Sequence, residues 1–209
     1  MKHIAIIGGT GSTGKEFIKL ALESNYIVTS VERNPKQKNS DKLKVIKGDV
    51  TDLESLIEAF KDIDIVISCF GPSNHKQVGN LMSEGTINIV KACEKNKVKR
   101  FVFMSGCVQA DPNEFSIIGN LAIRFFRNYY RQSYTTKIIA EKAIKESSLD
   151  WVIIRAVGLK HSKPTGKYKA GIKARVSFSL MSYTDCTKCL FDAIDEYNWT
   201  RQIINVGKY

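Results

Sequence analysis

Residues 1–14 read MKHIAIIGGTGSTG, and this stretch determines how the rest of the chain is interpreted. A short apolar run, Ile4–Ile7, leads into two overlapping glycine spacings, G-x-G-x-x-G from Gly9 and G-x-x-G-x-x-G from Gly8. Apolar residues at helical spacing follow at once, which predicts a strand, a tight turn and a helix. In that order, the glycines let backbone N–H groups approach a pyrophosphate at the positive end of the helix. The stretch therefore predicts a dinucleotide site rather than a glycine loop without a ligand.

A chain of 209 residues is long enough for a single domain with a substantial core, and we expect one domain over 1–209. The apolar run at the N-terminus is too short for a signal peptide, and no window approaches the ~20 apolar residues of a membrane span. We therefore expect a cytoplasmic protein. The five cysteines are an odd number in hydrophobic surroundings, which is typical of reduced thiols. Cys186-x-x-Cys189 has no second pair, so we expect a helix face there and no metal site.

The net charge of +11 makes nucleic acid or an anionic surface a conceivable partner. The positive residues form four clusters, at 33–47, 91–100, 124–131 and 155–175. The second is typical of a solvated helix end, whereas the others fall where an α/β domain would hold a phosphorylated cofactor and an acidic substrate. Because no nucleic-acid motif is visible, we expect small-molecule ligands, no nucleic acid, and a monomer or homodimer.

The second predicted strand ends at Glu32-Arg33-Asn34-Pro35, about 20 residues past the glycines, where a dinucleotide fold meets the adenosine ribose. An acid there accepts hydrogen bonds from a free 2′-hydroxyl, whereas an arginine favours a 2′-phosphate. Side chains alternate along a strand, so Glu32 and Arg33 do not easily face the cofactor together. We assign the role to Arg33, supported by Lys36 and Lys38, and predict NADPH as the cofactor. The alternative is a solvated Arg33 with Glu32 selecting NADH.

Strand and helix patterns alternate along the rest of the chain. The expected strands are 26–31, 43–47, 63–70, 101–104, 151–155 and 202–206. The expected later helices run through Phe60 after a Thr51 or Asp52 cap, over 80–96 and 133–147, and from an Asp185 cap through Ile194. This alternation predicts an α/β, Rossmann-like, doubly wound and mainly parallel sheet, with strand order 3-2-1-4-5-6-7 and helices on both faces. A basic flap at about 158–178 is expected on the substrate side.

The segment of about 116–131 is an insertion of less regular character. Its apolar residues recur with helical period and its polar ones lie opposite. The two sets are Ile118, Leu121, Ala122, Phe125 and Tyr129, and Arg124, Arg127, Asn128 and Arg131. Two interpretations stay open. The segment is either a half-buried helix, over the sheet or in a dimer interface, or an aromatic and arginine wall over the substrate.

Several stretches together carry a family resemblance. They are GGTGSTG, VERNP, GDV, SCFG, MSEGTINIVKACEKNKVKRFVFMSG and SSLDWVIIRAVGL. The chain resembles the atypical short-chain dehydrogenases. Among these it is most similar to the NmrA-like NAD(P)H-binding group that includes biliverdin-IXβ reductase, also called NADPH flavin reductase. The likeness runs from Lys2 to Tyr209, with one extra stretch near 116–128.

The resemblance implies a set of cofactor contacts. For the pyrophosphate these are Gly8, Thr10, Gly11, Ser12, Thr13 and Gly14. Arg33 is implied for the 2′-phosphate, with Asp49 and Val50 for the adenine. Along the ribose and nicotinamide the implied residues are Phe70, Gly71, Met82, Met104 and Ser105, with Ala156, Val157 and Leu159 closing the nicotinamide side.

Two departures bear on the reaction. Where the biliverdin reductase has a serine and a histidine, this chain has Gly106 and Gly158, which weighs against a tetrapyrrole substrate. The Tyr-x-x-x-Lys pair of short-chain dehydrogenases is also one residue short. Ser105 is present as their serine, and Tyr134 and Lys137, three residues apart, can still share one helix face. These three are the candidate catalytic residues, with packing alone as the alternative role for Tyr134.

Doubtful acid–base residues favour an acceptor that needs no positioned proton donor. Flavins, quinones and tetrapyrrole-like molecules delocalise the charge that hydride delivers and take the proton from solvent. We therefore predict an NADPH-dependent oxidoreductase of such an acceptor. Its anionic groups would be received by Arg124, Arg127, Lys160, Lys163 and Lys167. The alternatives are a non-enzymatic NmrA-like redox sensor that binds NADP(H), and a carbonyl reductase or epimerase that uses Tyr134 and Lys137.

Overall fold

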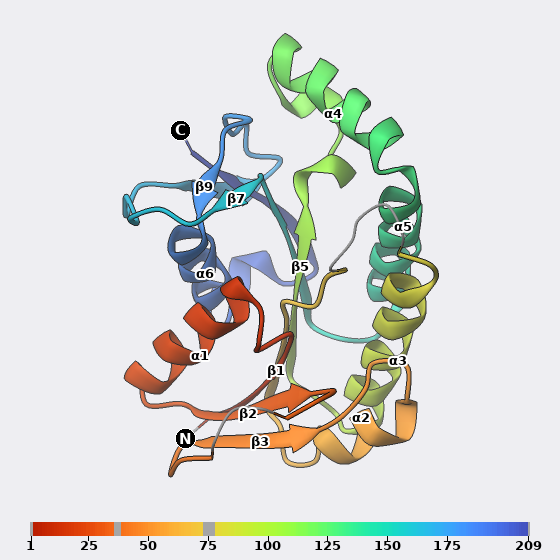
Figure 1. The fold of residues 1–209 in the computed structure, drawn as a ribbon, viewed down its shortest axis with the longest axis vertical. Coiled ribbons are helices and arrows are strands. Elements are labelled where there is room, and N and C mark those ends of the chain that lie inside the picture. Colours follow the sequence, from red (N-terminus) through yellow and green to blue (C-terminus); the bar gives the residue numbers. More distant parts are fainter. Residues whose placement is uncertain (1, 36–38, 73–77, 209) are drawn as a thin grey trace.

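The central feature of the computed structural model, which describes residues 2–35, 39–72 and 78–208, is one eight-stranded sheet (Figure 1). Its strand order is β3-β2-β1-β4-β5-β6-β10-β8. In that order the strands are Leu43–Lys47, Ile27–Glu32, His3–Ile7, Ile65–Ser68, Arg100–Gly106, Trp151–Ala156, Gln202–Gly207 and Lys169–Ile172. Every neighbouring pair is parallel except β10 with β8. The predicted order of seven strands is confirmed, and β8 adds an antiparallel edge strand that was not predicted.

Helices cover both faces of the sheet, as predicted (Figure 1). They are α1 Ser12–Glu23, α2 Leu53–Ala59, α3 Leu81–Lys95, α4 Ile117–Tyr129, α5 Arg131–Glu146 and α6 Tyr183–Asp192. One core lies between α1, α6 and the sheet, where Phe17 packs near Ile4 and Cys186. The other lies beneath α2, α3 and α5 and includes Phe101. Both faces of the central strands are therefore buried, which explains their continuous apolar runs.

The helix caps follow the sequence at α2 and depart from it at α6. Asp52 caps α2 by accepting hydrogen bonds from the N–H groups of Glu54 and Ser55. At α6 the predicted Asp185 cap is wrong, because Ser182 is the capping residue and accepts from the Asp185 N–H. The Asp185 carboxylate instead accepts from the N–H of Thr165 and of Gly166, at 3.0 Å each, and ties the flap to α6.

The flap adds a second, two-stranded sheet, in which β7 (Leu159–Lys160) pairs in parallel with β9 (Met181–Ser182). The described residues also form three short 3₁₀ helices, η1 Cys107–Gln109, η2 Pro112–Glu114 and η3 Tyr197–Trp199.

The inserted segment is a helix whose apolar stripe faces away from the sheet. In α4 only Gly119 and Ile123 are buried, whereas Ile118, Leu121 and Phe125 are exposed. Gly119 lies on the inward face, close to Phe115. A Cβ at position 119 would be 2.9 Å from the Phe115 Cβ, so only a glycine lets the helix approach Phe115 this closely. The interpretation of α4 as a half-buried helix over the sheet is therefore wrong.

Membrane-spanning helices and clustered metal ligands are both absent from the described ranges. None of the helices there combines the length and the apolar character needed to cross a membrane. In the same residues, no three His, Cys, Asp or Glu side chains are grouped to hold a metal ion. Cys186 and Cys189 are free thiols buried on the inner face of α6, as the sequence predicted.

Candidate functional site: the carboxyl edge of the sheet

The turn between β1 and α1 is shaped to receive an anion. Gly8 has a φ of +82°, and its carbonyl accepts a hydrogen bond from the Gly11 N–H at 3.0 Å. Gly11 is the N-cap of α1 and supplies no side chain, so no side-chain cap occupies the first N–H groups of the helix. A Cβ on Gly14 would lie 2.1 Å from the Gly8 oxygen. The turn therefore closes tightly on itself and leaves amide donors at the positive end of the helix, which fits a pyrophosphate.

A residue of the flap, absent from the predicted site, lies next to this turn. The imidazole Nε2 of His161 is 3.3 Å from the Ser12 hydroxyl, and its ring lies 4.6 Å from that of Tyr183. The neighbouring Thr13 is buried, and its carbonyl accepts a hydrogen bond from the Thr187 hydroxyl of α6. No local pattern marks His161, because it follows β7 and reaches α1 only through the path of the flap. Thr10 is exposed at the tip of the turn.

The end of β2 separates its two candidate residues. Glu32 is buried and accepts a hydrogen bond from the Ser30 hydroxyl at 3.0 Å, whereas Arg33 is exposed. Hydrogen bonding from the Thr51 N–H, aided by the positive charge of Arg33, lowers the pKa of Asp49. The Arg33 charge is thus near enough to Asp49 to act on its carboxylate. Lys36 and Lys38 lie outside the described residues.

Val50, assigned to the adenine, and Phe70, assigned to the ribose and nicotinamide, both lie against a glycine that the predicted site did not include. A Cβ on Gly85 of α3 would lie 2.9 Å from a Val50 methyl carbon and 3.2 Å from the Phe70 ring. The tips of β3 and β4 thus come together because α3 presents no side chain at Gly85. A glycine within a helical pattern is the signal that could have identified it. Met82, one turn earlier, is completely buried in the core, so it offers no surface to a ligand in this structure.

Ser105, at the end of β5, belongs to a buried polar network. Its hydroxyl donates to Glu141 Oε1 at 2.7 Å, and both residues are at most 3% exposed. Arg155, at the end of β6, donates to the same carboxylate at 3.2 Å through Nε and at 2.5 Å through Nη2. Glu141 and Arg155 were missed by the sequence analysis. The sequence spacing could have identified Glu141, because it follows Lys137 by four residues and Tyr134 by seven. This spacing places all three on one face of α5.

Lys137 reaches the same strand end, but Tyr134 is engaged elsewhere. The Lys137 Nζ lies 3.7 Å from the position that a Cβ on Gly106 would occupy, an ordinary van der Waals distance, so the ammonium lies beside the end of this strand. Arg127 places its guanidinium carbon 4.9 Å above the Tyr134 ring. The structure thus brings Ser105 and Lys137 to the end of β5 and stacks Tyr134 under α4.

The lowered pKa of Lys137 has a consequence for stability. Burial lowers this pKa from its usual 10.5, against the opposing effects of Glu141 and Cys107. Between the two pKa values the unfolded chain binds more protons than the folded chain, so this contribution to stability rises with pH there. The rise is about 1.4 kcal/mol per pH unit within that window. The free energy of unfolding of the parent minus that of Lys137→Met should increase with pH, as measured by thermal unfolding from neutral pH to 10.5. A difference that stays constant with pH would contradict the burial of this ammonium.

The remaining nicotinamide-side residues line the ends of β4, β5 and β6. Ala156 and Val157 are buried, Met104 and Leu159 are half-buried, and Gly71 is exposed.

The candidate substrate cations differ in exposure and in their hydrogen-bond partners. Lys160, Lys163 and Lys167 are exposed on the flap, and Arg124 is exposed with its Nε donating to Asn120. Arg127 instead donates to the carbonyls of Val108 and Ala110, at 2.9 and 2.6 Å, and so holds α4 to the loop after β5.

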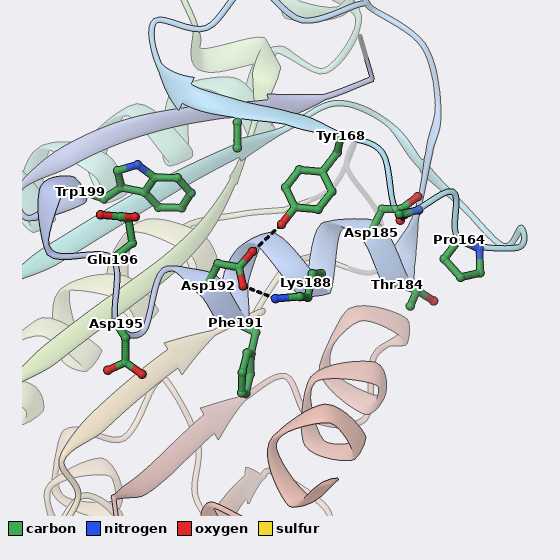
Figure 2. A pocket seen from close by; sticks show the side chains of 12 residues that line it. Pro164, Tyr168, Thr184, Asp185, Lys188, Phe191, Asp192, Asp195, Glu196 and Trp199 are labelled. Carbon is green, nitrogen blue, oxygen red and sulfur yellow. Dashed lines mark hydrogen bonds and ion pairs between the residues drawn. The ribbon is translucent and has the colours of Figure 1, made fainter. Parts of the chain in front are cut away.

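A hollow of about 920 Å³ lies away from these residues, between the flap, α6 and η3 (Figure 2). Its lining includes Asp192, which accepts a hydrogen bond from the Tyr168 hydroxyl at 2.6 Å and pairs with Lys188. Asp185, Asp195 and Glu196 also line it, and none of the predicted site residues does. Four carboxylates disfavour a pyrophosphate, so this hollow is not the dinucleotide site.

The comparison with protein families decides the class of the chain. A family model described as NAD(P)H-binding matches residues 8–196, which begin in the glycine turn. The chain belongs to this NAD(P)H-binding family. The resemblance seen in the sequence is thereby confirmed. The glycine turn before α1, with its N–H groups at the positive end of the helix, fits the pyrophosphate of NAD(P)H, which the family binds.

Curated relatives of this NAD(P)H-binding protein match mostly over part of their own length. A chloroplastic protein of Arabidopsis thaliana is 29% identical over 79% of this chain and 62% of the relative. The UPF0659 protein of Saccharomyces cerevisiae is 27% identical over 85% of this chain and 80% of the relative. Anthocyanidin reductase of Arabidopsis thaliana is 29% identical over 56% of this chain and 40% of its own length.

Solved structures share the fold at low identity. A short-chain dehydrogenase/reductase of Veillonella parvula in complex with NADP has a TM-score of 0.82 at 21% identity, covering 99% of this chain and 94% of the other. A structure described as a putative NADH-flavin reductase of Streptococcus pneumoniae has a TM-score of 0.82 at 17% identity, covering all of both chains. At these identities the likeness concerns the fold of the NAD(P)H-binding protein.

Proposed function

We propose that this NAD(P)H-binding protein is an NADPH-dependent reductase of a conjugated acceptor, such as a flavin, a quinone or a tetrapyrrole-like molecule. The observation that carries the proposal is the Ser105–Glu141 hydrogen bond of 2.7 Å between two buried groups. A hydroxyl that donates to a carboxylate is not free to donate to a substrate carbonyl. The Tyr134 ring lies under the Arg127 guanidinium, so a simple ketone would lack a free donor from either residue. A conjugated acceptor instead delocalises the charge and takes its proton from water.

The residues of the site have separate roles in this proposal. Bound NADPH would supply the hydride. The N–H groups that begin α1 hold its pyrophosphate, and Arg33 holds the 2′-phosphate. Lys137, whose Nζ lies beside Gly106 at the end of β5, would stabilise the negative charge that develops on the acceptor there. Reductases among the relatives and the structural neighbours, anthocyanidin reductase for one, support the reaction class.

The choice of NADPH over NADH is tested at the end of β2. Arg33→Ala should weaken NADPH binding by about 1–2 kcal/mol, roughly tenfold, because a charge-assisted contact to the 2′-phosphate is lost. NADH, which lacks that phosphate, should bind almost unchanged. Titration calorimetry with both nucleotides measures this, with Glu32→Gln as the variant that should spare NADPH. Equal losses for both nucleotides in Arg33→Ala would reject the assignment.

The acceptor class is tested by following NADPH oxidation with FMN, a quinone and an aldehyde. We expect turnover with FMN or the quinone, little with the aldehyde, and rates within about twofold of the parent in Tyr134→Phe. Loss of a true proton donor would cost about 10²–10⁴-fold. An aldehyde activity that collapses in Tyr134→Phe would support the carbonyl reductase instead. Tight NADPH binding without turnover of any acceptor would support the redox sensor.

A further inference from the structure

The net charge of the chain originates in two segments. Residues 115–140 contain four Lys and Arg and no acid, and residues 151–184 contain seven and no acid. The rest of the chain carries 21 Lys and Arg against all 21 Asp and Glu, so these two segments account for the whole net charge of +11. Eight of their eleven cations are exposed, namely Arg124, Arg131, Lys160, Lys163, Lys167, Lys169, Lys173 and Arg175.

The fold brings the two segments together at one end of the molecule. Figure 1 shows α4 and the β7–β9 flap at the same end, beyond the carboxyl edge of the sheet. The contact between them is aromatic, because the Phe178 ring lies 6.1 Å from that of Phe126 in α4 and 6.1 Å from that of Phe115. A Cβ on Gly119 would also lie 3.5 Å from the Phe178 Cβ. Positive charge that is dispersed in the sequence is therefore concentrated in space.

Beside this charge, α4 presents an apolar stripe to solvent. Ile117, Ile118, Leu121, Phe125 and Tyr129 are between 48 and 82% exposed. They follow one another at helical spacing along the full length of the helix, and the Phe125 and Tyr129 rings stack at 5.8 Å. An exposed apolar surface of this extent on one helix marks a docking surface.

The arginines near the apolar stripe indicate which partner binds it. Two copies paired through α4 would bring Arg124 and Arg131 of both chains to one interface, with no acid between Glu114 and Glu141 to neutralise them. An anionic bilayer instead attracts those arginines and accepts the apolar side chains between its headgroups. Arg127 takes no part, since its guanidinium is bound to backbone carbonyls.

We propose that α4 docks this protein on an anionic lipid surface, with its apolar stripe inserted at the level of the headgroups and Arg124 beside the stripe. The basic flap packs against the opposite face of α4, at Gly119 and Phe126, and adds to the attraction through its charge. The docking is peripheral and needs no membrane-spanning helix. It rests on the charge and exposure of α4 and the flap, and is independent of the reaction that the protein catalyses.

The test is flotation of the full chain with phosphatidylcholine vesicles, with and without phosphatidylglycerol. We expect binding only to the vesicles that contain phosphatidylglycerol, weakened by salt. Leu121→Gln with Phe125→Gln should weaken it about a hundredfold, as loss of two inserted apolar side chains predicts. Arg124→Gln should weaken it about fivefold. Tyr197→Gln, an exposed ring on η3, and Lys91→Gln, an exposed cation on α3, are the matched controls and should bind as the parent does.

Because the substituted side chains are exposed, all variants should keep the parent's melting temperature. Failure to bind anionic vesicles, or equal binding to neutral ones, would overturn the proposal. So would a Leu121/Phe125 variant that binds as the parent does, since charge alone would then explain binding. Sedimentation that shows a dimer, dissociated by the same double variant while no vesicle binds, would assign the stripe to a second copy of the chain.

Discussion

Replacing Glu141 by alanine should lower the free energy of unfolding by about 3–5 kcal/mol. The Glu141 carboxylate is 2% exposed and receives three hydrogen bonds, one from Ser105 and two from Arg155. The Arg155 side chain is only 13% exposed. Without Glu141, a buried guanidinium and a buried hydroxyl therefore lose their acceptor, and neither reaches enough water to replace it.

Urea unfolding followed by circular dichroism measures this change. Glu146→Ala, which removes an exposed partner of Lys142 on the same helix, should stay within about 0.5 kcal/mol of the parent. Glu141→Leu combined with Arg155→Met removes both charges and should recover most of the loss. A loss below about 1 kcal/mol in Glu141→Ala would show that the buried network does not form.

Replacing Gly14 by alanine should abolish measurable binding of either nicotinamide nucleotide. The added methyl would lie 2.1 Å from the Gly8 oxygen and 2.8 Å from the Gly9 Cα, both backbone atoms that cannot rotate away. The start of α1 would have to separate from the turn, and its N–H groups would no longer converge on the pyrophosphate. Loss of two such charge-assisted contacts corresponds to about a hundredfold or more in affinity.

Overpacking at Gly14 should also cost about 1–3 kcal/mol of folding stability, so binding is measured on protein shown to be folded at the temperature used. Gly171→Ala is the matched control. Gly171 lies in β8, and a Cβ there would be 3.6 Å from the Ala174 Cβ, an ordinary van der Waals distance. Both the folding stability and the nucleotide affinity should therefore stay near those of the parent. Nucleotide binding retained in Gly14→Ala would place the pyrophosphate elsewhere.

The elements and their order could be predicted because their signals are local. The apolar runs of β1 and β4, the Asp52 cap and the helical spacing behind the glycines each depend on residues within a turn or two. The strand order followed from the preference for short, right-handed parallel connections. The edge strand β8 was missed because it lies in a basic flap without alternation, and its antiparallel partner β10 is distant in the chain.

Side-chain environments were predicted less well. The stripe on α4 was correctly identified as helical, yet periodicity does not state which face of a helix is buried. In the structure the buried face is the one with Gly119 and Ile123. Asp185 was taken as a cap when it anchors the flap. Ser105 was assigned to the site through the resemblance to short-chain dehydrogenases, but its partner Glu141 is 36 residues away on α5. No local rule connects such pairs.

By itself, the sequence determined that this is a doubly wound α/β protein with a phosphate-binding turn, because glycine geometry and hydrophobic period act over a few residues. Only the tertiary structure decided where the charges and hydroxyls at the edge of the sheet are directed. Ser105 and Arg155 share Glu141, and the apolar stripe of α4 remains in solvent. These outcomes depend on packing between segments that are distant in the chain, where burial and the need to satisfy buried polar groups select the partners.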